Sequence, residues 1–76
     1  MTRKNLELLV KRLNAINGFE NPQYYTVGSY RLHKDGIGYA IQKVCNEAGG
    51  VSNVGNISGM TTKECYFFLS GLLANL

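Results

Sequence analysis

The sequence predicts a small α+β domain in the order α-β-β-β-α, with a three-stranded antiparallel sheet and two helices packed on one of its faces. Near both ends of the chain, apolar residues recur at intervals of three and four, the period of an amphipathic helix. Residues 24–54 lie between these segments and are rich in aromatic, β-branched and glycine residues, which is typical of strands joined by turns. A chain of 76 residues suffices for one domain, so residues 1–76 are expected to fold as a unit.

The clearest helix is predicted for residues 61–76. Thr61 and Glu64 have the spacing of a capping box, which satisfies two backbone N–H groups at a helix start. Met60 and Cys65 are placed to form the accompanying hydrophobic staple. The buried stripe of this helix is expected to consist of Cys65, Phe68, Leu69, Leu72, Leu73 and Leu76.

A first helix is predicted for residues 2–17, with Thr2 as its N-cap. Gly18 is expected to end it in a left-handed conformation, with Phe19 folding back as the apolar partner. The stripe facing the core would contain Leu6, Leu9, Val10, Leu13 and Ile16.

Three strands are predicted between the helices, at residues 24–33, 38–45 and 51–54. Gly28 is expected to mark a bulge or bend inside the first strand. Asp35-Gly36 is a strong hairpin signal, and Ala48-Gly49-Gly50 predicts the second turn. The other face of the sheet would be open to solvent or to a partner. The predicted core is Leu6, Leu9, Val10, Leu13, Ile16, Tyr30, Leu32, Tyr39, Ile41, Val51, Cys65, Phe68, Leu69, Leu72 and Leu73.

The composition indicates a cytoplasmic protein with reduced thiols. Eight Lys and Arg against five Asp and Glu give a net charge of +3, which permits nucleic-acid binding without requiring it. Cys45 and Cys65 are not part of a C-x-x-C motif, so the sequence predicts no zinc or redox site. No apolar run approaches the ~20 residues of a membrane span, and the N-terminus does not resemble a signal peptide.

The sequence predicts no catalytic residue, cofactor or metal. His33 is the single histidine, and a nucleophilic pair with Cys45 or Cys65 is conceivable. Packing explains Cys65, however, and a turn position explains His33. The carboxylates are scattered, and no glycine-rich phosphate-binding motif precedes a helix.

One candidate surface is apolar and would bind another protein or a second copy of the chain. Tyr66 and Phe67 widen the apolar arc of the last helix, and Leu8 lies opposite the stripe of the first. A chain this short buries only about 60% of its unfolded surface, so a homodimer would add stability.

The alternative surface would bind nucleic acid. Tyr24, Tyr25, Tyr30 and Tyr39 could stack on bases while neighbouring cations hold phosphates. Tyrosines also favour strands because they pack well there, so this pattern alone does not decide between base stacking and core packing. The basic residues in question are Arg3, Lys4, Lys11, Arg12, Arg31, Lys34 and Lys43.

The chain resembles a group of small uncharacterised proteins of bacteriophages and prophages. The resemblance is carried by residues 11–14 (KRLN), 38–39 (GY), 46–51 (NEAGGV), 60–64 (MTTKE) and 69–73 (LSGLL). It implies a phage or prophage origin, and hence a bacterial host, but little about chemistry.

In the order of its elements alone, the predicted fold is similar to double-stranded RNA-binding domains. Those domains use basic residues at the start of the last helix to contact phosphates. Here the corresponding residues 61–64 include one lysine beside a glutamate, and a Gly-Pro-x-His segment is missing. The similarity therefore implies the fold and not the binding of RNA.

Overall fold

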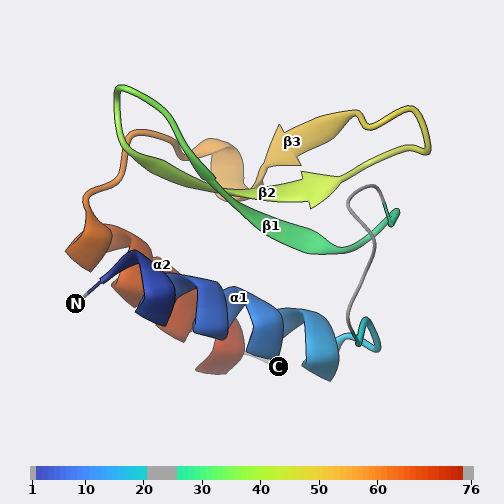
Figure 1. The fold of residues 1–76 in the computed structure, drawn as a ribbon, viewed down its shortest axis with the longest axis horizontal. Coiled ribbons are helices and arrows are strands. Elements are labelled where there is room, and N and C mark those ends of the chain that lie inside the picture. Colours follow the sequence, from blue (N-terminus) through green and yellow to red (C-terminus); the bar gives the residue numbers. More distant parts are fainter. Residues whose placement is uncertain (1, 21–25, 75–76) are drawn as a thin grey trace.

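The computed structural model describes residues 2–20 and 26–74 and confirms the predicted α+β fold class. The two helices lie side by side on one face of the sheet and begin at the same end of it (Figure 1). In chain order the elements are α1 (Arg3–Ile16), β1 (Tyr30–Lys34), β2 (Tyr39–Val44), β3 (Val51–Asn53), a short 3-10 turn η1 (Val54–Asn56) and α2 (Thr62–Ala74).

The sheet is antiparallel, with the strand order β1-β2-β3. Leu32 pairs with Ile41, and Gln42 pairs with Asn53. Because successive side chains alternate between the two faces of a strand, this register fixes which residues face the helices. The helix-facing side carries Tyr30, Leu32, Lys34, Tyr39, Ile41 and Lys43, and the second face carries Arg31, His33, Ala40, Gln42, Val44, Val51 and Asn53.

Both predicted ends of α1 are confirmed. The Thr2 hydroxyl accepts a hydrogen bond from the Asn5 N–H at 3.4 Å, and Asn5 Oδ1 accepts one from the Thr2 N–H at 3.1 Å. At the other end Gly18 has φ +88°, and the Phe19 N–H donates to the Asn14 carbonyl at 2.8 Å. This is a Schellman ending, in which a left-handed residue lets the chain turn back on the last helical carbonyls.

The predicted capping box of α2 is also present. The Thr61 N–H donates to Glu64 Oε1 at 2.9 Å, and the Glu64 N–H donates to the Thr61 hydroxyl at 3.1 Å. Met60 and Cys65 are both buried in the core, as a hydrophobic staple requires. Met60 also exchanges two backbone hydrogen bonds with Tyr39, of 2.8 and 2.9 Å, so the start of α2 is tied to β2. The last two residues of the predicted helix lie outside the described residues.

The first strand is shorter than predicted. β1 begins at Tyr30, so Gly28 lies in a turn just before the strand and not inside it. The predicted bulge is present there: the Gly28 N–H donates to the Val44 carbonyl at 2.9 Å and the Val44 N–H donates to the Ser29 carbonyl at 3.0 Å, so two residues oppose one. The turn is closed by a 3.1 Å hydrogen bond from the Ser29 N–H to the Thr26 carbonyl, and Gly28 has the positive φ of +90° that such a turn demands. The ring of Phe19 packs on this glycine, where a Cβ would lie 2.9 Å from Phe19 Cζ.

Most of the predicted core is confirmed, with two errors. Ile16 is 54% exposed because it lies on the flank of α1, about 80° around the helix from Leu6. Val51 is 39% exposed because its pairing with Val44 places it on the second face of the sheet. The predicted residues that are fully or partly buried are Leu6, Leu9, Val10, Leu13, Tyr30, Leu32, Tyr39, Ile41, Cys65, Phe68, Leu69, Leu72 and Leu73.

The second face of the sheet is less open than predicted. Ala40 and Val44 point away from the helices but are only 2% and 1% exposed. Their neighbours Arg31, His33 and Gln42 are half-buried and polar. This face therefore does not present an exposed apolar surface to a partner.

Candidate binding surfaces

The outer surface of the helix layer carries exposed apolar side chains from both helices. Leu8 is 56% exposed and Phe67 is 60% exposed. Each follows by two residues a side chain that is completely buried, Leu6 in α1 and Cys65 in α2. Two residues correspond to about 200° of helical rotation, so both side chains point away from the sheet. Both helices lie on the same face of the sheet (Figure 1), so Leu8 and Phe67 are both on the side of the helix layer that faces away from the sheet.

The third residue predicted for this surface, Tyr66, has a supporting position. It is half-buried and packs against the core. Its ring meets that of Phe67 edge to face, with centroids 5.7 Å apart and an interplanar angle of 66°. Tyr66 thereby limits the orientations of Phe67. Ile16, which the sequence pattern assigned to the core, adds a further exposed apolar side chain on α1.

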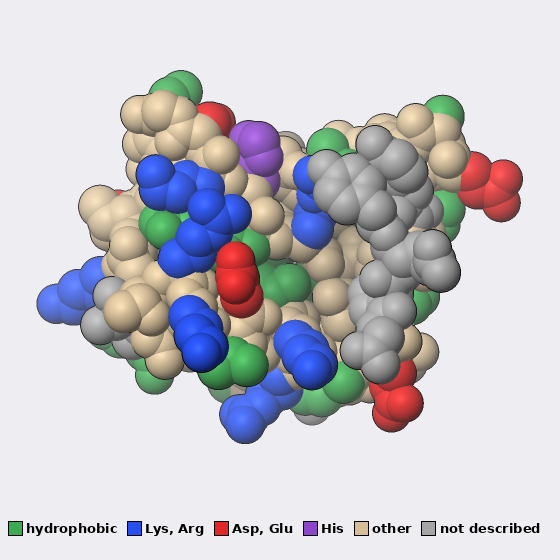
Figure 2. All heavy atoms as spheres, viewed as in Figure 1, with side chains coloured by type: hydrophobic (Ala, Val, Ile, Leu, Met, Phe, Trp, Pro, Cys, Tyr) green, Lys and Arg blue, Asp and Glu red, His purple; other side chains and the backbone are tan. Residues whose placement is uncertain are grey.

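The predicted basic residues form an extended positive surface. Figure 2 shows Lys and Arg side chains spread over α1 and the adjoining part of the sheet, with few acidic side chains among them. Arg3 forms a 3.2 Å ion pair with Glu7, one turn further along α1. Arg31 is half-buried on the second face of the sheet. The remaining predicted cations, Lys4, Lys11, Arg12, Lys34 and Lys43, are exposed.

The sheet tyrosines do not provide the predicted stacking surface. Tyr39 is 7% exposed and Tyr30 is half-buried against the core. Lys34 Nζ lies 5.7 Å from the centroid of the Tyr39 ring, and Lys43 Nζ lies 5.6 Å from that of Tyr30. Each lysine is the cross-strand neighbour of the tyrosine it covers. Core packing and cation–π contacts therefore occupy the ring faces that a base would need. Tyr24 and Tyr25 lie outside the described residues.

Two of the short motifs singled out in the sequence, residues 11–14 and 46–51, contribute side chains that hold the fold together. The Asn14 side chain donates to the Tyr30 carbonyl at 2.9 Å and accepts from the Tyr30 N–H at 2.6 Å, which joins α1 to β1. Asn46 Oδ1 accepts from the Gly50 N–H at 2.9 Å and shapes the β2–β3 turn. The sequence offered one signal for Asn14: it is a polar residue on the buried stripe, four positions after Val10.

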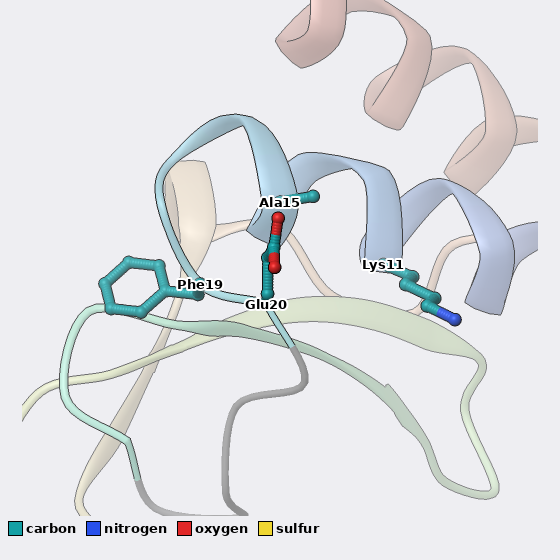
Figure 3. Close-up of a pocket in the computed structure, with 4 residues that line it drawn as sticks. All are labelled: Lys11, Ala15, Phe19 and Glu20. Atoms are coloured by element: carbon teal, nitrogen blue, oxygen red, sulfur yellow. The ribbon is translucent and has the colours of Figure 1, made fainter.

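One hollow lies beside the end of α1. It is about 250 Å³ in volume and is lined by Lys11, Ala15, Phe19 and Glu20. In Figure 3 the Glu20 side chain points toward Ala15, whereas the Phe19 ring points away toward the turn before β1. Both charged groups are exposed. The hollow therefore does not bring desolvated polar groups together, as a built ligand site would.

The groups considered for nucleophilic chemistry are not brought together. His33 lies on the second face of the sheet, and its Nε2 is 3.5 Å from Asp35 Oδ2. Cys65, on α2, is buried in the core, and this burial raises the pKa of its thiol to about 11. Cys45 is exposed, with its Sγ 3.3 Å from the Ser52 hydroxyl, and strand alternation directs it away from the face that carries His33.

Two backbone N–H groups hold Asp35 in the β1–β2 hairpin loop. Its Oδ1 accepts from the Ile37 N–H at 2.8 Å and from the Gly38 N–H at 3.2 Å, and these hydrogen bonds lower the pKa of Asp35. Within residues 2–20 and 26–74, no three His, Cys, Asp or Glu side chains are grouped as metal ligands.

Neither described helix has the length and hydrophobicity needed to cross a lipid bilayer. Comparison with known proteins adds no family to this description. No family model matches the chain, and neither does any curated protein or solved structure.

Proposed function

We propose that this chain is a non-enzymatic accessory protein of phage or prophage type, which acts in the bacterial cytoplasm by binding another protein. The observation that carries the proposal is the exposure of Leu8 and Phe67 on the side of the helix layer that faces away from the sheet. Aromatic side chains such as that of Phe67 are enriched in protein interfaces, where a few buried anchors supply most of the binding energy. The resemblance of residues 11–14, 46–51 and 60–64 to phage proteins supports the proposed origin.

Photocrosslinking tests the proposal even though the partner is unidentified. A photoreactive benzophenone side chain in place of Leu8 is expected to trap one host or phage protein, whereas the same group in place of Ile37 is not. Ile37 is a suitable control because it is 80% exposed but lies in the β1–β2 hairpin loop. The trapped protein is then purified and its affinity measured by calorimetry. Leu8→Gln should weaken binding by about tenfold or more, and Ile37→Gln should leave it unchanged.

Sedimentation velocity at micromolar concentration separates a second copy of the chain from a different protein. A mass near 8.4 kDa would mean that the chain is a monomer, so its partner is a different protein. Twice that mass, reduced to 8.4 kDa by Leu8→Gln, would mean that the partner is a second copy of the chain. Equal affinity of the Leu8→Gln and wild-type proteins for the trapped partner would overturn the proposal.

A second candidate function is the binding of nucleic acid through its phosphates. It is favoured by the positive surface in Figure 2 and by the net charge of +3. The rings of Tyr30 and Tyr39 are covered by lysines, so nucleic acid would be bound without base stacking on them. The phosphates would be held by the exposed cations Lys4, Lys11, Arg12, Lys34 and Lys43. Fluorescence anisotropy with short DNA and RNA at two salt concentrations tests it. Binding should weaken with salt and be indifferent to Leu8→Gln, and affinity that does not change with salt would exclude phosphate contacts.

A further inference from the structure

We infer that the partner docked on α1 presents an acidic surface with an apolar centre. This inference rests on the proposed protein-binding function and specifies the chemistry of the partner. It follows from three features of the described residues: the cations before and after Leu8, the position of the single carboxylate of α1, and the distribution of carboxylates over the rest of the chain.

Cations lie one turn before and one turn after Leu8 on the exposed side of α1. Lys4 precedes it by four residues, and Lys11 and Arg12 follow it by three and four. Side chains at these intervals are neighbours on a helix surface. All four residues are exposed, and Ile16 extends the apolar part of the stripe one turn beyond Arg12. We name this set, Lys4, Leu8, Lys11, Arg12 and Ile16, the α1 stripe.

The α1 stripe keeps a net positive charge, although Glu7 neighbours Lys4 and Lys11 on the helix surface. Glu7 is the single acidic residue of the helix, and its Oε1 is held by Arg3 Nε at 3.2 Å. A protein that covers Leu8 and Ile16 must bring its own groups close to Lys4, Lys11 and Arg12. Placing like charges together in an interface is unfavourable, so carboxylates are the complementary groups.

A second copy of this chain does not have the complementary surface. The chain has five Asp and Glu side chains, and all are among the described residues. They lie on five separate segments, in α1, after its end, in the two hairpin loops and in the first turn of α2: Glu7, Glu20, Asp35, Glu47 and Glu64. A symmetric contact of α1 with itself would bring Lys4, Lys11 and Arg12 of the two copies together. The charge pattern therefore favours a different, acidic protein over a homodimer.

Synthetic helical peptides test the inference on the intact protein. The probe has a leucine stripe flanked by glutamates. One control peptide replaces the leucines by serine, and another replaces the glutamates by lysine. Calorimetry should show binding of the leucine–glutamate peptide alone, weakened by salt. Arg12→Glu and Leu8→Gln should each weaken it by about tenfold or more. Lys43→Glu makes the same change in net charge on the helix-facing side of β2 and should leave the affinity within about twofold of wild type.

Three results would overturn the inference. They are no binding of the leucine–glutamate peptide at millimolar concentration, equal losses in Arg12→Glu and Lys43→Glu, and binding of the serine–glutamate peptide as tight as that of the probe. The last two would mean attraction by net charge without a specific surface. If the partner trapped at position 8 is not acidic but its binding still requires Leu8, the inference fails while the proposed function stands.

Discussion

The side-chain amide of Asn14 binds both backbone groups of Tyr30, so a residue of α1 takes the place of a neighbouring strand beside β1. β1 is an edge strand, and edge strands have backbone groups without a partner in the sheet. The two hydrogen bonds, of 2.6 and 2.9 Å, satisfy the Tyr30 N–H and carbonyl at the point where the strand begins. They also fix the position of α1, and with it the α1 stripe, relative to the sheet.

Asn14→Ala should therefore lower the free energy of unfolding by about 1–3 kcal/mol, because it leaves a partly buried N–H and carbonyl unsatisfied. Urea denaturation followed by circular dichroism measures this change. Lys11→Ala, on the exposed side of the same helix, is the control and should stay within about 0.5 kcal/mol of wild type. If Asn14→Ala proved as stable as Lys11→Ala, the two hydrogen bonds between Asn14 and Tyr30 would not contribute to stability.

Gly38→Ala should also destabilise the protein, by about 1–3 kcal/mol or more. Gly38 has φ +149°, and a Cβ there would lie 2.7 Å from the Met60 carbonyl oxygen, at the junction of β2 with the start of α2. Gly36, in the same hairpin loop, has no positive φ, and no atom lies within 4 Å of the position that a Cβ would take there. Thermal unfolding of the two alanine variants should thus differ clearly. Equal melting temperatures would mean that β2 and Met60 do not approach as described.

Stability should fall at acidic pH through two carboxylates held by hydrogen bonds. The backbone N–H and hydroxyl of Thr61 lower the pKa of Glu64 from its ordinary value of 4.5, and loop N–H groups lower the pKa of Asp35 from 3.8. A group with a lowered pKa binds fewer protons in the folded than in the unfolded state. The stability that such a carboxylate contributes is thus complete at pH values above its pKa in the unfolded state. This stability is lost as the pH falls through its pKa in the folded state.

The melting temperature should consequently be nearly constant from pH 7 to about pH 5 and decrease below about pH 4.5. In the double variant Glu64→Gln, Asp35→Asn this decrease should be smaller, since the two groups no longer titrate. The double variant Glu20→Gln, Glu47→Gln removes the same two negative charges at exposed positions and is the charge-matched control. An acid-side decrease that is the same in the Glu64→Gln, Asp35→Asn variant and in wild type would contradict the assignment.

The two cysteines should differ sharply in reactivity. Cys65 is completely buried, and its raised pKa of about 11 leaves little thiolate at pH 8, whereas Cys45 is exposed. A thiol-reactive chromophore should thus titrate one cysteine rapidly in the native protein and the second only after denaturation. Cys45→Ser is expected to remove the rapid phase. Two rapid phases in the wild-type protein would show that Cys65 is not buried in the core.

Local signals in the sequence predicted most of the fold. The capping box at Thr61 and Glu64, and the left-handed Gly18, act within a few residues, so their spacing suffices to locate the helix ends. Periodicity also identified most of the core. It failed at Ile16 and Val51 because a period gives the direction of a side chain and not the element that covers it.

The candidate surfaces were less predictable because they depend on contacts between distant parts of the chain. The exposed positions of Leu8 and Phe67 follow from helix geometry and were predicted. The covering of Tyr30 by Lys43 depends on the strand register, and the role of Asn14 depends on α1 lying against β1. Neither pairing can be read from residue spacing.

Nuclear magnetic resonance of the protein with its photocrosslinked partner tests the central claim most directly, that the outer surface of the helix layer is the docking surface. Addition of the partner is predicted to shift the resonances of Leu8, Ile16 and Phe67 most strongly. Signals of His33 and Gln42, on the second face of the sheet, should move little. Shifts confined to His33, Gln42 and their neighbours, with Leu8 and Phe67 unaffected, would contradict the account.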